Sequence, residues 1–197
     1  MVSQSRKIIL NIFLSLALLI ICVAIRPMSL TNNSGISYFG IHFSTVVPYA
    51  ITFLINSYLY WHIAIAINKQ SKINKLMSVA LFIMSAMFIG LILTPYTYLS
   101  GLHEFFGSVL FSLQLILSLV ITFLYKKWWF IAMTITELSS GILMFHYLPL
   151  KNGLLLQMQI IFQIAFLILL AGLFNIQKGT SNLHKISKST TIIDRLI

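Results

Sequence analysis

Five polar side chains that could bind a ligand stand next to the ends of long apolar segments. They are Arg26, His42, His103, Glu104 and His146. Three imidazoles and a carboxylate could bind zinc and leave an open position for water, whereas a guanidinium could hold a lipid phosphate or another anion. No short motif joins them, because they come from several separate segments. Two interpretations stay open: a polar ligand pocket, with or without a metal ion on the three histidines, or side chains that only face headgroups and water.

Four more polar side chains lie deep inside apolar segments: Asn56, Gln114, Glu137 and Gln163. Glu137 lies about 13 Å beyond the start of its predicted helix, at 1.5 Å per residue, and the other three reach a similar level. An ionised carboxylate at that depth is costly, so we expect Glu137 to be protonated or hydrogen-bonded. It could handle a proton or bind a substrate. Alternatively, a neutral Glu137 hydrogen-bonds an amide and locks the helices together.

The composition of the chain indicates a membrane protein. Of its 197 residues, 59% are hydrophobic and only 8% are charged, whereas a soluble domain has about 25% charged residues. The net charge of +10 comes from short basic clusters between apolar runs and from no single basic stripe. Membrane lipids are therefore the expected partners, and nucleic acid is not.

Six apolar segments are long enough to cross a bilayer, whose hydrocarbon core of about 30 Å needs about 20 residues of helix. They cover residues 8–25, 44–67, 76–93, 104–125, 128–147 and 154–174. Only Lys126 and Lys127 separate the fourth segment from the fifth. A single helix through this pair would place two charges in mid-membrane, which is too costly. The predicted fold is an all-α bundle of six transmembrane helices (1–175) followed by a polar, basic tail (176–197).

The basic residues also predict how the bundle is oriented. With the N-terminus in the cytoplasm, eleven of the 13 Lys and Arg residues fall in cytoplasmic segments, and only Arg26 and Lys151 face out. The opposite orientation would violate the positive-inside rule in every loop. We therefore expect a multi-pass protein of the cell membrane with both termini in the cytoplasm.

Motifs for enzyme chemistry are missing from the sequence. It contains no glycine-rich phosphate loop, no H-E-x-x-H, no G-x-S-x-G and no C-x-x-C, so no cofactor is predicted. The only aspartate, Asp194, lies in the tail, which excludes intramembrane aspartyl chemistry. Small residues four apart, Ala86 with Gly90 and Ser108 with Ser112, instead predict close packing of the third and fourth helices.

Four short motifs give the chain a family resemblance. They are Ser37-Tyr38-Phe39-Gly40, Gly90-Leu-Ile-Leu-Thr94-Pro95, Leu102-His103-Glu104-Phe105-Phe106-Gly107 and Gly153-Leu-Leu-Leu-Gln157. In this order the chain, over residues 8–174, resembles the prokaryotic six-helix membrane family called domain of unknown function 998, which is similar to Frag/DRAM-type membrane proteins. The resemblance implies a six-helix fold, with His103 as the family's histidine and Arg26 as its basic residue after the first helix. It implies no activity, and a Cys or Asp expected near Pro95 is absent.

Three functions follow as hypotheses. The first is a non-enzymatic membrane protein that binds a lipid or small ligand in an outer-facing pocket. We call the residues of this predicted pocket the five outer residues: Arg26, His42, His103, Glu104 and His146. The second is a small transporter or channel that uses the mid-membrane polar layer. The third is a metal-dependent lipid hydrolase at the outer face.

Overall fold

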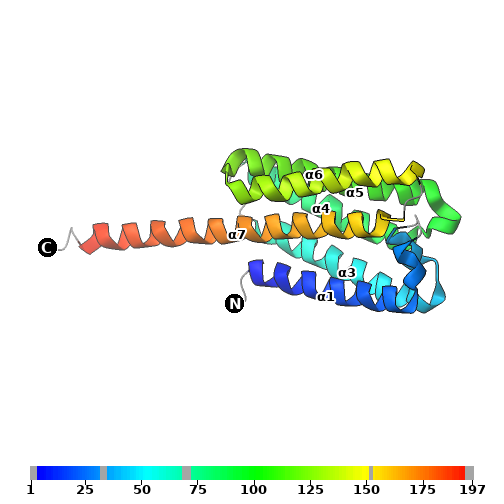
Figure 1. Ribbon diagram of the computed structural model, residues 1–197. Helices are drawn as coiled ribbons and strands as arrows, with labels where there is room; N and C mark the ends of the chain where they lie inside the picture. The colour runs from blue at the N-terminus through cyan, green and yellow to red at the C-terminus, as the bar shows by residue number, and fades with distance from the viewer. Residues whose placement is uncertain (1–3, 32–34, 68–71, 151–152, 194–197) are drawn as a thin grey trace.

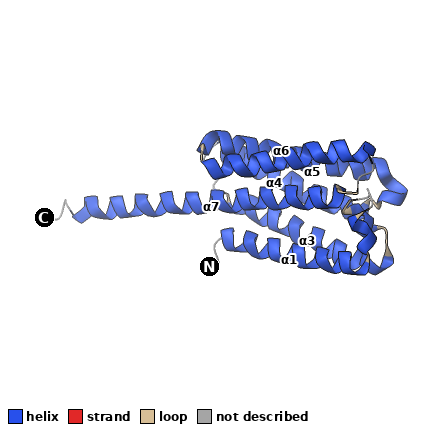
Figure 2. Ribbon diagram, in the orientation of Figure 1, coloured by secondary structure: helices blue, strands red, loops and turns tan. Residues whose placement is uncertain are grey.

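The computed structural model describes residues 4–31, 35–67, 72–150 and 153–193; the side chains of residues 72, 145–150 and 177–193 lie outside this description. Within these ranges the chain forms seven α-helices and one short 3-10 helix, with no strand. The helices are α1 (Gln4–Ile25), η1 (Pro27–Leu30), α2 (Ser37–Gly40), α3 (Phe43–Ala66), α4 (Lys72–Leu93), α5 (Tyr96–Tyr125), α6 (Trp128–Leu150) and α7 (Leu155–Ile193). The long helices form one elongated bundle (Figures 1 and 2).

Four helices in the described part of the chain are long and apolar enough to cross a membrane. They are α1, Ile73–Leu93 of α4, α5 and Leu155–Ile176 of α7. Helix α3 has 24 residues but carries Thr52, Asn56 and Ser57 within the bundle, which lower its mean hydropathy. Large apolar side chains such as Phe13 (67% exposed) and Phe123 (75% exposed) point away from the core. Such a surface suits lipid rather than water.

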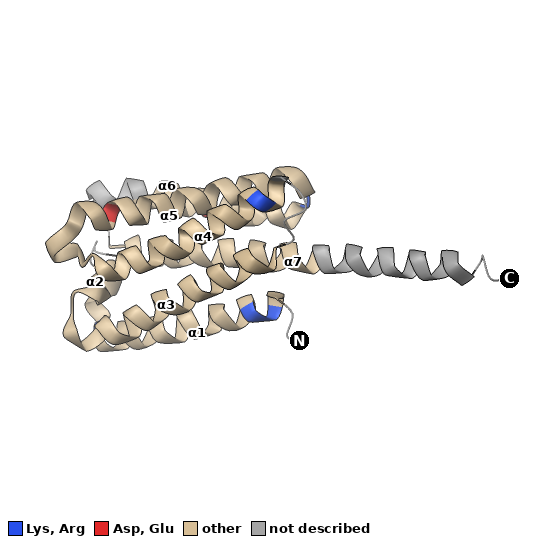
Figure 3. Cartoon of the chain, turned by 180° about the vertical axis from the view of Figure 1, so that it is seen from behind, with Lys and Arg blue, Asp and Glu red and all other residues tan. Residues whose placement is uncertain are grey.

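The two ends of the bundle differ in charge. Figure 3 shows basic residues at the start of α1 and around the turn between α5 and α6, and the acidic residue of α5, Glu104, at the opposite end. We call these the Lys126 end and the Glu104 end. The segments η1 and α2 lie at the Glu104 end, where the chain passes from α1 to α3.

The predicted separation of the fourth and fifth helices is confirmed at the two lysines. Helix α5 ends at Tyr125 and α6 begins at Trp128. Lys126 caps α5 in the left-handed conformation, with φ 48°, and its N–H donates to the carbonyl of Thr122. A residue with positive φ stops helix propagation, so the chain turns there and both lysines stay at the end of the bundle.

Two helices are longer than the predicted spans. Helix α5 starts at Tyr96 rather than near residue 104. The chain is already helical directly after Pro95, and it bends at Leu99 (φ −133°, ψ 47°). Helix α7 runs through most of the predicted tail (176–197), to Ile193, and extends past the other helices in Figure 1. No proline follows Pro149 in the sequence, so every later residue has the backbone N–H that a continuing helix needs.

Small polar side chains join neighbouring helices. The hydroxyls of Ser57 in α3 and Ser85 in α4 lie 2.9 Å apart, and each also bonds to the other residue's carbonyl. Gly90 of α4 lies so close to α5 that an added Cβ would stand 2.8 Å from the Phe106 ring. Close approach of this kind is the usual way in which helices associate where the surroundings are apolar.

Gly172 provides a test of the packing between α6 and α7. A Cβ at this position would overlap the Trp129 ring, so Gly172→Ala should lower the free energy of unfolding by about 1–3 kcal/mol, as overpacking does. Gly101→Ala is the matched control, because a Cβ there meets nothing within 4 Å; helix propensity should keep or raise its stability by up to about 1 kcal/mol. Thermal unfolding in detergent measures both, and equal stability of the two variants would contradict the packing.

Candidate functional site

A cavity of about 620 Å³ lies inside the bundle, on the side of the Glu104 end. All of the long helices and α2 contribute to its wall. Along α5 its lining runs from Tyr96 to Leu115 and along α7 from Leu155 to Leu167, and the α7 stretch makes it about 18 Å deep at 1.5 Å per residue. Cavities of about 300–1,000 Å³ are typical of ligand-binding sites.

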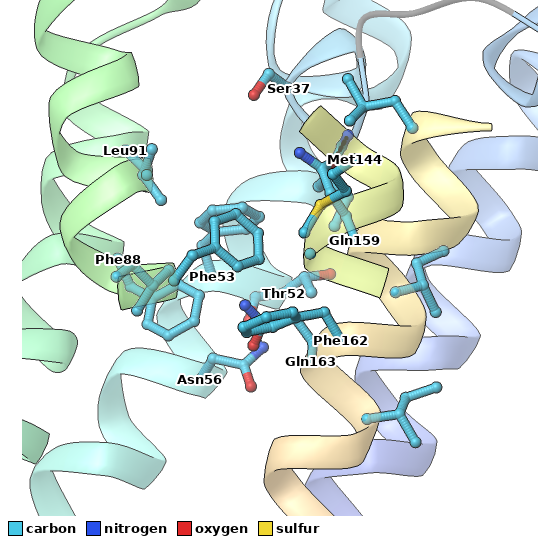
Figure 4. A pocket seen from close by; sticks show the side chains of 18 of the residues that line it. Ser37, Thr52, Phe53, Asn56, Phe88, Leu91, Met144, Gln159, Phe162 and Gln163 are labelled. Carbon is cyan, nitrogen blue, oxygen red and sulfur yellow. Dashed lines mark hydrogen bonds between the residues drawn. The ribbon is translucent and has the colours of Figure 1, made fainter. Parts of the chain in front are cut away.

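The middle of the cavity is apolar and its two ends are polar. Phe53, Phe88 and Phe162 form part of the apolar wall, while Ser37 stands at one end and Asn56 and Gln163 stand at the other (Figure 4). The site therefore offers hydrogen bonds at each end and mainly hydrophobic contact between them, with the hydroxyls of Ser108 and Ser112 on the α5 side. This pattern fits a ligand with a long apolar part.

His103 holds the α2 segment over the Glu104 end of the cavity. Its Nδ1 lies 2.6 Å from the carbonyl oxygen of Thr94, so Nδ1–H donates there. In the neutral ring, Nε2 then accepts a hydrogen bond from the Ser37 hydroxyl, 2.7 Å away. A second contact supports the same segment, since the N–H of Ile36 donates to Gln159 Oε1 at 2.7 Å.

Glu104 and Tyr96 form the polar rim beside His103. The Tyr96 hydroxyl donates to Glu104 Oε1 at 3.3 Å, and the Tyr96 ring lies edge-on to the His103 ring, with centroids 5.8 Å apart. Both Glu104 and Tyr96 are exposed and line the cavity. A carboxylate is thus available to a ligand at the mouth.

Paired amides form the other end of the cavity. Gln114 and Gln163 exchange two hydrogen bonds of 2.9 and 3.0 Å, and Gln114 Nε2 also donates to the Tyr60 hydroxyl at 3.0 Å. Next to them Asn56 Nδ2 donates to the hydroxyl of Ser15 at 3.1 Å and to the carbonyl of Thr52 at 2.9 Å. These bonds join α5 to α7 and α1 to α3 on the side of the apolar section that faces the Lys126 end.

Glu137 is fully buried and does not line the cavity. Its Oε1 accepts a hydrogen bond of 2.8 Å from Ser118, whereas its Oε2 has no partner among the described residues. The predicted mid-membrane layer is therefore three separate contacts: Gln114 with Gln163, Asn56 with Ser15, and Glu137 with Ser118.

Of the four predicted outer residues whose side chains the structure describes, His103 and Glu104 line the cavity, whereas Arg26 and His42 do not. Arg26 is directed toward α3, with Nε 3.4 Å from the Ser44 hydroxyl. His42 packs edge-on against Tyr38, 4.5 Å between ring centroids, and its buried Nε2 has no described partner. The side chain of His146 lies outside the described residues. Among the described residues, no group of three His, Cys, Asp or Glu side chains could hold a metal ion.

The sequence interpretation missed several side chains of the site: Ser37, Tyr96, Ser108, Ser112 and Gln159. Ser108 and Ser112, predicted to pack helix against helix, are instead exposed and line the cavity. The helical periodicity of α5 could have identified Ser108 and Ser112 as residues of the site. Residues 104, 108, 111, 112 and 115 lie on one helix face, and that face begins at the rim carboxylate.

No protein-family model, curated protein or solved structure matches the chain. The resemblance to the six-helix family therefore stays a prediction that rests on the four short motifs. What the protein does has to be inferred from the cavity and its polar ends.

The glutamine pair predicts a measurable coupling between α5 and α7. Gln114→Leu and Gln163→Leu should each lower the free energy of unfolding by about 1–3 kcal/mol, because the first leaves the half-buried Gln163 amide and the second the fully buried Gln114 amide without its partner. The double variant should lose less than the sum of the single losses, by about 1 kcal/mol. Unfolding in mixed micelles measures all three variants, and strictly additive losses would show that the two amides do not interact.

Proposed function

We propose that this chain is a six-span protein of the cell membrane that binds an amphiphilic ligand, a lipid or a small molecule with a long apolar part, inside the bundle. The observation that supports this function most directly is the cavity of about 620 Å³. Its apolar middle suits a hydrocarbon chain, and its polar rim at Glu104 and Tyr96 suits a headgroup.

Helices α3 and α6 complete the six proposed spans. They have 24 and 23 residues, enough to cross about 30 Å of hydrocarbon. Arg6, Lys7, Lys126 and Lys127 lie at one end of the bundle. The positive-inside rule then assigns that end to the cytoplasm and the Glu104 end, with the mouth of the cavity, to the outer side.

The packing of α5 against α6 supports entry of the ligand from the bilayer. The hydrogen bonds described between these helices lie toward the Lys126 end: Ser118 to Glu137 at 2.8 Å, and Thr122 to Thr134 at 2.7 Å. Nearer the Glu104 end, Ser112 of α5 and Ile142 of α6 both line the cavity and are both exposed. The cavity thus reaches the side of the bundle between α5 and α6, where lipid chains would stand.

A carrier is the second candidate function. Its support is the buried Glu137 Oε2, which has no partner among the described residues, because a carboxyl group in this position is unusual unless it is used. The paired Gln114 and Gln163 lie between the cavity and the Lys126 end, and they would have to separate for a ligand to pass.

Filling the cavity should abolish binding. A Cβ at Gly141 would lie 3.6 Å from the Phe162 ring, an ordinary contact, so Gly141→Leu fits the backbone and places its side chain beside the cavity wall that Gly141 forms. We expect at least about a tenfold loss of affinity for a dodecyl alcohol probe, since about 1.4 kcal/mol of lost apolar contact corresponds to that factor. Native mass spectrometry of the protein in neutral detergent measures it.

Gly101→Leu is the control for this experiment, because Gly101 has open space around it and does not line the cavity. It should bind the probe as the parent protein does. Unchanged binding by a folded Gly141→Leu variant would remove the cavity as the binding site.

Accessibility of introduced cysteines tests the orientation. Cys22 is fully buried, and Cys22→Ala supplies a background without thiols. In this background we expect an impermeant maleimide to label Ser100→Cys in intact cells, because exposed Ser100 lies at the Glu104 end. Lys127→Cys should react only after permeabilisation. The reverse pattern would invert the proposed topology.

A further inference from the structure

We propose that the cavity selects amphiphiles with a cationic headgroup, an amine or quaternary ammonium, which Glu104 and Tyr96 bind at the rim. This inference rests on the proposed function and specifies its ligand class. Among the described residues that line the cavity, Glu104 is the only acid, and no Lys or Arg stands with it.

The Glu104 carboxylate has capacity left for a ligand. Its Oε1 accepts one long hydrogen bond, 3.3 Å from the Tyr96 hydroxyl, and no described residue bonds to its Oε2. Glu104 is exposed, as is Tyr96 at 43%. A headgroup at the mouth can therefore reach the free oxygen without displacing a contact within the protein.

Among the described residues, the positive groups near this end of the bundle that would favour an anionic headgroup are engaged elsewhere. Arg26 lies at the same end of the bundle but is outside the cavity, with its Nε directed to Ser44. Both nitrogens of His103 are used, one donating to Thr94 and the other bonded to Ser37. Of the charged side chains described in the cavity wall, a phosphate or carboxylate headgroup would meet only the like charge of Glu104, which costs free energy.

Aromatic rings favour the same class of headgroup. Tyr96 lines the rim next to the carboxylate, and the face of a tyrosine attracts ammonium groups, including quaternary ones that donate no hydrogen bond. Below the rim, Phe111 of α5 and Phe162 of α7 lie edge to face, with ring centroids 5.0 Å apart, on the wall that would enclose the tail.

The opening between α5 and α6 suits such a ligand. An amphiphile in the outer leaflet keeps its headgroup near the membrane surface, at the level of Glu104, while its tail moves sideways into the cavity. The exposed hydroxyls of Ser108 and Ser112 line this path on α5. They offer a moving headgroup hydrogen bonds in an otherwise apolar opening.

The test compares three probes with the same chain: dodecyltrimethylammonium, dodecyl alcohol and dodecanoate. Binding to the full-length protein in a neutral detergent is measured by native mass spectrometry at equal probe concentrations. We expect the ammonium probe to bind about tenfold more tightly than the alcohol, the factor expected for one partly exposed charge pair assisted by an aromatic face. Dodecanoate should bind most weakly.

Glu104→Gln should remove about that tenfold preference, so that the ammonium probe and dodecyl alcohol bind with similar affinity. The matched control is Glu137→Gln, which makes the same exchange at the carboxyl that does not line the cavity, and it should keep the preference. Tyr96→Phe should retain most of it, because the ring stays and only the hydroxyl bonded to Glu104 is lost.

Failure of this inference can be told apart from failure of the proposed function. If the parent protein binds all three probes equally, or prefers dodecanoate, the headgroup assignment is wrong while the binding cavity stands. The same conclusion follows if Glu104→Gln keeps the ammonium preference. If neither the parent protein nor the Gly141→Leu variant binds any probe, the amphiphile-binding function itself is overturned.

Discussion

Polar side chains inside an apolar bundle must find their hydrogen-bond partners within the protein, because hydrocarbon supplies none. Gln114 and Gln163 satisfy this requirement with two reciprocal bonds. Ser57 with Ser85 and Asn56 with Ser15 do so between other helix pairs. Each bond requires one helix rotation, since a turn of either helix would separate the partners. The arrangement of the remaining side chains, including the cavity wall, follows from these rotations.

The uneven distribution of these bonds explains where the cavity lies. Toward the Lys126 end, Ser118 and Thr122 of α5 bond to residues of α6. Toward the Glu104 end, small residues of both helices, such as Ser112 and Gly141, face an open volume instead. The α2 segment covers that volume at the Glu104 end, because His103 and Gln159 hold the segment there by hydrogen bonds. A bundle closed at one end and held open at the other is suited to receive a ligand.

Charge is segregated along the same axis. Apart from Arg26, the described basic residues lie toward the Lys126 end, whereas the exposed carboxylate of Glu104 stands at the opposite end beside the cavity (Figure 3). In the proposed orientation this asymmetry has two effects. It favours retention of the basic end in the cytoplasm, and among the described residues it leaves Glu104 as the one charged group in the cavity wall, although the whole chain has a net charge of +10.

Composition and hydropathy were sufficient for the helical fold and for the break at Lys126 and Lys127, because each depends only on the transfer of residues between water and hydrocarbon. They were also sufficient to identify His103, Glu104 and Gln163 as unusual. The sequence did not indicate that Arg26 and His42 face away from the cavity, or that Tyr96 and Gln159 complete it. Those facts depend on helix rotation and on the path of the η1–α2 segment. Both are set by contacts between residues as far apart in the sequence as Ile36 and Gln159, so only the tertiary structure decides which polar side chains meet.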